Sequence, residues 1–236
     1  MKNKWFLFIT VFVLFPAFLS KAEAAMENEW DSETFSTGNF SELFLKGSFK
    51  VFLIQGDAGK LEVRASDPRA FDYLNVRNEN GLLKVYVDRE PFDFSRVSLY
   101  LTFKTLERLE IKGGVQLRTR GFLNLENFFV RLEGGAKVDF RAKAHRFGMK
   151  TEGGVWFELA GVSDVLGLNI SGAGHIDAGE MRSEHVDIRI DGVGTARVFP
   201  TATLNAQIYG MGKVKYRGNP EVTEHIEGLG AVRREE

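Results

Sequence analysis

The sequence predicts an all-β protein, a β-solenoid of stacked coils with about seven glycine-marked coils in its C-terminal half. Three observations predict this fold. A short pattern centred on glycine recurs at nearly constant spacing from residue 111 onward. Between the glycines, apolar and polar residues alternate with the period of two that gives a strand one buried face. The chain has 25 Gly and 21 Phe but only 5 Pro, a composition typical of short strands joined by tight turns.

The N-terminus has the layout of a secretory signal peptide. Lys2 and Lys4 precede an apolar run over residues 5–19, and Ala22-Glu-Ala24 supplies the small-x-small step of a cleavage site, with cleavage expected after Ala24. The run has about 15 residues, short of the roughly 20 that a membrane-spanning helix needs. We therefore expect a signal peptide over residues 1–24, with an uncleaved anchor as the alternative. The mature protein is then exported (periplasmic, outer-surface or secreted) and has no membrane span.

The region from residue 34 to residue 110 is also predicted to be β-structure, but in an irregular form without the glycine pattern. Strand-like runs are separated by turn signals such as Asn78-Glu-Asn-Gly81, and one short helical turn is expected over residues 71–74. The strand-like runs cover residues 43–45, 49–54, 61–63, 82–87 and 97–103. No linker rich in Ser or Pro follows, so we expect a single domain over residues 34–232, with the repeat coils at 111–232.

The repeat places a leading glycine between two apolar positions. One lies two residues before the glycine and the other lies four residues after it. The leading glycines are Gly113, Gly134, Gly153, Gly172, Gly192, Gly210 and Gly228, spaced 21, 19, 19, 20, 18 and 18 residues apart. A fixed period near 19 predicts one supersecondary unit stacked along an axis, with like positions forming columns. A glycine in every copy indicates a corner that needs a positive φ or a close approach of two coils. The second glycine moves from Gly114 in early copies to Gly174 in later ones, which predicts a change of corner near residue 160.

Composition excludes several classes of function. The formal charge of −1 argues against nucleic-acid binding, which needs a clear basic excess. The chain has no cysteine, which excludes disulfides, iron–sulfur clusters and thiolate zinc sites. The four histidines lack the spacing of a metal site, and no Gly-x-Ser-x-Gly or His-Glu-x-x-His motif occurs. We therefore expect no cofactor, no metal and no enzymatic activity.

One outward column carries the candidate ligand-binding residues. Three residues after the leading glycines, Trp156 and His175 should stand next to each other on neighbouring coils. An aromatic face suits the apolar side of a sugar ring, so the pair could form a sugar-binding platform. The alternative is that the tryptophan covers a neighbouring loop.

A second outward column, directly before the leading glycines, holds Glu133, Glu152 and Asp191. Carboxylates stacked about 4.8 Å apart could bind Ca²⁺ or act as acid and base, which would make the protein a carbohydrate-active β-helix enzyme. The competing interpretation is a solvated charge column in which Lys112 offsets Glu133. Basic residues of the early coils, such as Arg118, could meet acidic polysaccharide or lipid headgroups, but acidic residues alternate with them.

The layout of residues 49–56, 61–63 and 82–85, followed by serial units such as Ile-Ser-Gly-Ala-Gly at residues 170–174, resembles the head GIN domain of auto-transporter adhesins. The resemblance covers roughly residues 34–232. It implies a right-handed parallel β-helix-like fold in an exported bacterial envelope protein. The family is one of unknown function and has no catalytic residues to transfer.

These observations together predict a non-enzymatic envelope or cell-surface module with an adhesion, binding or assembly role. Its partner would be a glycan or an envelope protein. Only four residues follow the last repeat unit, at Val232. An open solenoid end offers strand edges for pairing, so self-association through the C-terminal coil is a further expectation.

Overall fold

The structure, a computed structural model, describes residues 30–57, 59–87 and 96–235. Over these residues it contains 13 strands and one helical turn, α1 (Ala70–Tyr73). The prediction of an all-β protein is confirmed. The predicted signal peptide, residues 1–24, lies outside the described residues.

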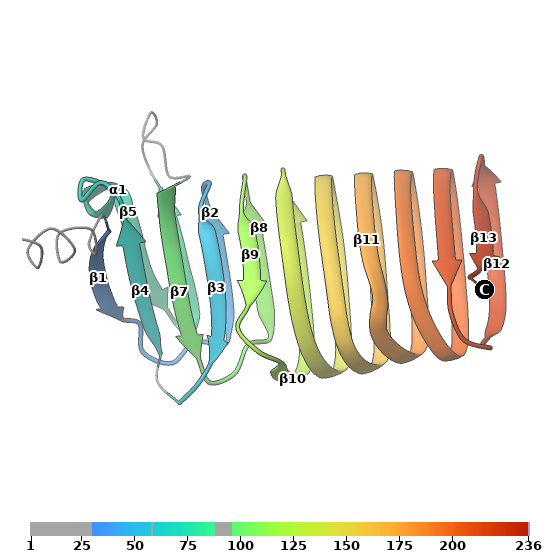
Figure 1. Cartoon of the computed structure of the whole chain (residues 1–236), viewed down its shortest axis with the longest axis horizontal. Helices are drawn as coiled ribbons and strands as arrows, with labels where there is room; N and C mark the ends of the chain where they lie inside the picture. The colour runs from blue at the N-terminus through green and yellow to red at the C-terminus, as the bar shows by residue number, and fades with distance from the viewer. Residues whose placement is uncertain (1–29, 58, 88–95, 236) are drawn as a thin grey trace, which may run out of the picture.

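The C-terminal half winds in regular turns along the long axis of the molecule (Figure 1). Its strands are β10 (Leu123–Glu133), β11 (Ala136–Tyr216), β12 (Glu221–Gly228) and β13 (Ala231–Arg234). Pairing between them is parallel and joins residues one repeat apart, as in Leu132 with Thr151 and Ile208 with Ile226. The 81 residues of β11 keep strand pairing throughout. Fully extended they would span roughly 270 Å, so the chain has to turn repeatedly within this one strand.

Two apolar columns of the repeat fill the interior. Ile111, Leu132 and Ile170, two residues before their leading glycines, are completely buried, and so is Phe157 in the column four residues after. Both columns stay buried until the last coil, where Ile226 and Val232 are half-buried. Four phenylalanines pack against one another in stacked, tilted and edge-on pairs, with ring centroids 5.2 to 6.4 Å apart. They are Phe128, Phe140, Phe147 and Phe157. These contacts make one continuous core under the coils.

The leading glycines meet both conditions that their recurrence indicated. All seven have φ between +97° and +130°, a region that L side chains rarely adopt. They also stack on one another. A Cβ built on Gly153 would lie 2.8 Å from the carbonyl oxygen of Gly134, and one on Gly210 would lie 2.5 Å from that of Gly192.

The corner changes character between Gly153 and Gly172, as the shift in glycine position predicted. In early coils the residue two positions after the leading glycine is a buried apolar side chain, such as Val155. In late coils this position is glycine, and a Cβ on Gly174 would lie only 2.6 Å from Cγ2 of Ile170. In late coils a side chain at this position would therefore collide with the inward isoleucine.

The prediction that residues 34–110 lack the glycine pattern is wrong, because one coil of this region has it. Strands β2 (Glu42–Lys46) and β3 (Lys50–Gln55) pair in parallel with β8 (Arg108–Lys112) and β9 (Gln116–Thr119). Between β2 and β3, Gly47 has φ +145°, and its carbonyl oxygen lies 2.5 Å from a Cβ built on Gly113. Gly47 is thus an eighth member of the glycine stack, with Leu45 and Val51 at the two inward positions. The signal was in the sequence, but 66 residues separate Gly47 from Gly113 and hid the period.

The N-terminal end is not a simple continuation of parallel coils. Strands β6 (Leu82–Val87) and β7 (Val97–Phe103) pair in parallel with β2 and β3, although they come later in the chain. Strands β1 (Asp31–Ser36), β4 (Lys60–Ala65) and β5 (Leu74–Glu79) then pair antiparallel, β4 with β7, β1 with β4, and β5 with β6. These antiparallel strands cover the parallel edges of β6 and β7 at this end (Figure 1). The sequence had not predicted β1 or β5.

Candidate binding groove

An open groove of about 950 Å³ runs along the outside of the coils, just after the corner of the leading glycines. It is lined by the columns one, two and three residues after those glycines, from Gly114 in the early coils to Leu229 in the last. We call it the long groove. Because like positions stack, its walls repeat at the coil rise of about 4.8 Å.

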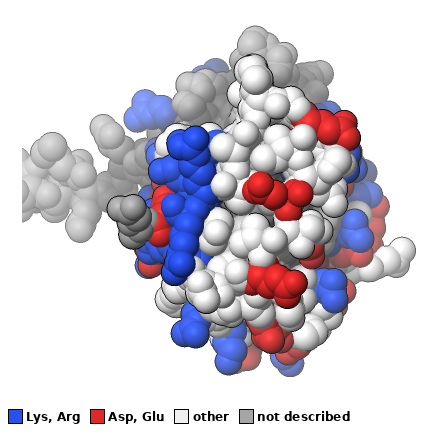
Figure 2. All heavy atoms as spheres, turned by 90° about the vertical axis from the view of Figure 1, so that its right-hand side faces the viewer, with Lys and Arg blue, Asp and Glu red and all other residues white. Residues whose placement is uncertain are grey.

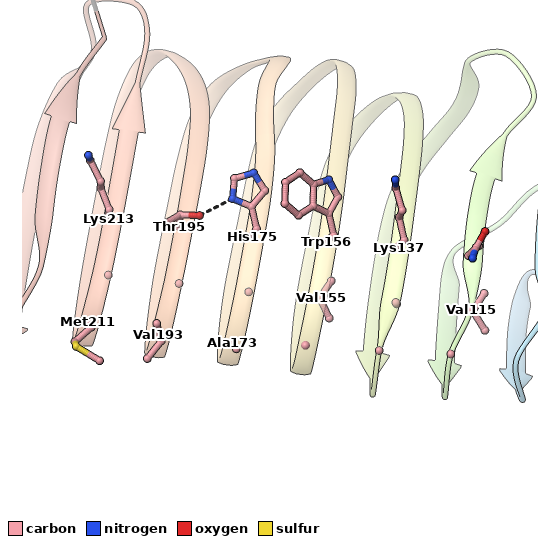
Figure 3. A pocket seen from close by; sticks show the side chains of 18 of the residues that line it. Val115, Lys137, Val155, Trp156, Ala173, His175, Val193, Thr195, Met211 and Lys213 are labelled. Carbon is pink, nitrogen blue, oxygen red and sulfur yellow. Dashed lines mark hydrogen bonds between the residues drawn. The ribbon is translucent and has the colours of Figure 1, made fainter.

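The two sides of the long groove differ in character (Figure 3). One side is an apolar rim, one residue after the leading glycines, where Val193 and Met211 are about half exposed. The opposite side, three residues after the glycines, is polar and aromatic, with Trp156, His175, Thr195 and Lys213 in successive coils. Small residues and glycines of the middle column form the floor.

Trp156 and His175 lie side by side, as the sequence predicted. Their ring centroids are 4.1 Å apart with an interplanar angle of 34°. The indole Nε1 donates to Glu158 Oε1 at 2.9 Å, and His175 Nδ1 lies 2.6 Å from Thr195 Oγ1. These hydrogen bonds fix both rings while 47% of Trp156 stays exposed. No loop covers the exposed indole among the described residues, so the rings form a fixed, open aromatic surface.

A basic cluster lies at the late-coil end of the long groove. It consists of Arg197, Lys213, Lys215, Arg217, Arg233 and Arg234, which line a hollow of about 630 Å³ together with Glu235. Figure 2, which faces this end of the molecule, shows Lys and Arg side chains gathered along one side of it. The cluster was not predicted from the sequence, because its members come from three coils. A search by column would have found Arg197, Lys215 and Arg233 in one row, five residues after their leading glycines.

Glu235 sits among these cations as their shared counter-ion. Its carboxylate lies 2.7 Å from Arg197 Nε and 3.5 Å from both Lys215 Nζ and Arg217 Nε. The hydrogen bond from Arg197, with smaller contributions from Lys215, holds the pKa of Glu235 below its usual range. The carboxylate is therefore ionised at neutral pH.

The carboxylates of the alternative enzymatic site lie in ion pairs. Glu133 contacts Arg131 at 2.7 Å and Lys112 at 3.2 Å, and Arg131 also reaches Glu152 at 3.3 Å. The hydrogen bond from Lys112 lowers the pKa of Glu133, the opposite of what a general acid needs. Asp191 is paired with Arg189 at 2.8 Å. The structure thus brings Glu133 and Glu152 together, but bridged by an arginine.

The sequence profile described as "Putative auto-transporter adhesin, head GIN domain" matches residues 39–220. The chain belongs to this family. No curated protein matches it.

Solved structures share the fold of this head GIN domain at low sequence identity. A "putative adhesin" from Bacteroides fragilis is 18% identical with a TM-score of 0.76, and the match covers 87% of this chain and 96% of the other. A "putative adhesin" from Parabacteroides distasonis is 18% identical with a TM-score of 0.66, covering 88% and 98%. A "Putative lipid binding protein" from Parabacteroides distasonis is 21% identical with a TM-score of 0.57, covering 88% and 97%. At these identities the likeness shows the fold alone.

Within residues 30–57, 59–87 and 96–235, no three His, Asp or Glu side chains gather in a way that could hold a metal ion. Within the same residues, no helix is long and apolar enough to cross a membrane.

Proposed function

We propose that this protein is an exported, non-enzymatic binding module of the cell envelope or cell surface, and that its long groove holds a linear glycan in an adhesion role. Family membership supports adhesion or binding in general. The observation that carries the glycan is the exposed Trp156–His175 pair in a groove that continues over successive coils.

The repeat of the groove suits a repeating polymer. Each coil adds about 4.8 Å to the groove, a step comparable in length to one sugar unit of a linear chain. The apolar rim at Val193 and Met211 and the indole of Trp156 offer surfaces for the apolar faces of the sugar rings.

This proposal includes the finer organisation of the chain. We propose a signal peptide over residues 1–24 and one domain over residues 34–232, folded as a right-handed parallel β-solenoid. Parallel pairing at one-repeat offsets and the stacked leading glycines support the solenoid. Self-association through the C-terminal coil stays a prediction, which sedimentation at high protein concentration would test.

Binding to an array of linear glycans tests the proposed function, with Trp156→Ala as the key variant. The exposed half of the indole offers roughly 100 Å², which at about 25 cal/mol per Å² corresponds to about 2 kcal/mol when a ligand covers most of it. We therefore expect Trp156→Ala to weaken glycan binding by about 10- to 30-fold. Phe122→Ala is the matched control, since Phe122 is also an exposed aromatic residue but lies outside the groove.

Two results would count against this function. A chain that binds no glycan on the array lacks the proposed activity. Release of new chain ends from a bound polysaccharide, abolished by alanine at Glu133, Glu152 or Asp191, would favour the enzymatic alternative.

A further inference from the structure

We propose that the glycan is acidic. In this inference, which rests on the proposed function, the basic cluster binds carboxylates of an anionic polysaccharide that lies in the long groove, and Glu235 occupies one of these carboxylate positions in the free protein.

The long groove leads directly into the basic cluster. A hollow of about 600 Å³ lies between them and is lined by His175 and Thr195 of the groove and by Arg197 and Lys215 of the cluster. Lys213 lines all three hollows. From Trp156 to Lys213 there are three coil steps, or roughly 14 Å. One extended polymer can therefore contact the aromatic pair and the cluster at the same time.

Within residues 30–57, 59–87 and 96–235, the six cations of the cluster outnumber the carboxylates that pair with them. Against its six cations stand Glu235 and two carboxylates at its border, Asp177 at 3.5 Å from Arg197 and Glu180 at 3.2 Å from Arg217. Among the described residues, no carboxylate lies within ion-pair distance of Lys213 or Arg233. The guanidinium of Arg234 donates a hydrogen bond to Asn219 Oδ1 at 3.4 Å.

Because the cationic side chains stack on neighbouring coils, their excess positive charge destabilises the free protein. Lys215 and Arg233 are direct partners in the parallel pairing of β11 and β13, and Arg197 precedes Lys215 by one repeat in the same column. Like charges directly opposite each other on paired strands destabilise a sheet. An anionic ligand relieves this repulsion, and clustered charge of one sign also speeds the encounter with such a ligand.

Glu235 shows which anion the cluster accommodates. Its carboxylate takes the place between Arg197, Lys215 and Arg217, with one oxygen shared by the two guanidinium groups. A ligand carboxylate could take this position by displacing Glu235. A formal charge of −1 for the whole chain argues that the cluster is a local site rather than part of a general polyanion-binding surface.

The test compares two polymers that share a backbone and differ in whether their carboxyl groups are charged or methyl-esterified. Polygalacturonate carries one carboxylate per sugar unit, and its fully methyl-esterified form has the same backbone without the charges. We would titrate both into the full chain, together with alginate and hyaluronate as further acidic polymers and dextran as a further neutral one. Titration calorimetry at two salt concentrations gives the affinity and its dependence on charge.

We expect at least one acidic polymer to bind at least about tenfold more tightly than the neutral polymers, with the advantage shrinking at high salt. The double variant Lys213→Ala/Arg233→Ala should lose roughly tenfold in affinity for the acidic polymer. The matched control is Lys143→Ala/Arg146→Ala, which removes two exposed cations outside the hollows. Glu235→Gln should bind the acidic polymer several-fold more tightly, because no ionised side chain then competes for the position.

Each of the other possible outcomes would overturn one specific part of the proposal. If neutral and acidic polymers bind equally and Lys213→Ala/Arg233→Ala has no effect, this inference is wrong and the proposed function stands. If no polysaccharide binds, both are wrong. Equal or tighter binding to phosphatidylglycerol vesicles or to single-stranded DNA would overturn the choice of polysaccharide. An unchanged or weaker affinity of folded Glu235→Gln would overturn the role given to Glu235.

Discussion

Replacing Gly153 by alanine tests whether the stacked glycines hold the coils at their spacing. Gly153 has φ +112°, and the added Cβ would lie 2.8 Å from the carbonyl oxygen of Gly134 and 3.2 Å from its amide nitrogen. A non-glycine residue in such a conformation costs about 1–3 kcal/mol. Making room for the Cβ against backbone atoms costs about 1–3 kcal/mol more. Lower entropy of the unfolded chain returns about 0.4–1 kcal/mol, which leaves a net loss of about 3 kcal/mol.

The neighbouring glycine provides a matched control. Gly154 does not have a positive φ, and a Cβ added there meets no atom within 4 Å. We therefore expect Gly154→Ala to leave the free energy of unfolding unchanged or to raise it by up to about 1 kcal/mol.

Urea denaturation followed by circular dichroism measures both variants, and thermal denaturation should show Gly153→Ala melting about 6–12 °C below the parent. If Gly153→Ala and Gly154→Ala unfold within about 0.5 kcal/mol of each other, the stacked glycine is not what the corner requires, and this reasoning is refuted.

Three further predictions concern buried polar groups and one ion-pair cluster. Thr151 lies in a column of aliphatic residues, and its completely buried Oγ1 has no hydrogen-bond partner among the described residues. Thr151→Val should therefore raise the free energy of unfolding by about 1 kcal/mol. Equal or lower stability of this variant in urea would contradict the prediction. Ser163 and Ser183 share a buried hydrogen bond of 2.8 Å, so Ser183→Ala should lower the free energy of unfolding by about 1–2 kcal/mol. Replacing both serines by alanine should lower it by less than the sum of the two single changes, which a double-mutant cycle measures. Because the folded-state pKa of Glu235 is lowered, its stabilising effect is present above the unfolded pKa of about 4.3 and is lost as pH falls through the folded value. The stability difference between the parent and Glu235→Gln should therefore shrink between about pH 5 and pH 3, and a difference that stays constant over this range would contradict the lowered pKa.

The repeat could be predicted in detail because each coil depends on local rules. The spacing of the glycines and the alternation around them reported which residues face inward, and Ile111, Leu132 and Phe157 are buried as this pattern predicted. The adjacency of Trp156 and His175 followed from the same column logic. A fixed period converts sequence distance into spatial distance, so neighbours on different coils can be read from the chain.

The N-terminal end could not be predicted in the same way. Strand β6 pairs with β2 and β7 pairs with β3 out of chain order, while β4 and β5 add antiparallel pairing at the edge. No period links these strands, so their partners depend on which edges remain open once the coils have formed. The place of Gly47 in the glycine stack became visible only through this pairing.

For this protein, then, the sequence by itself determined the β class, the coil period, the inward columns and the aromatic pair on the surface, because these follow from backbone geometry repeated every 18 to 21 residues. Only the tertiary structure decided the order of the N-terminal strands, the continuous long groove and the gathering of cations around Glu235. Those features depend on side chains from several coils meeting in space, and their electrostatic energy is set by distances that no single coil contains.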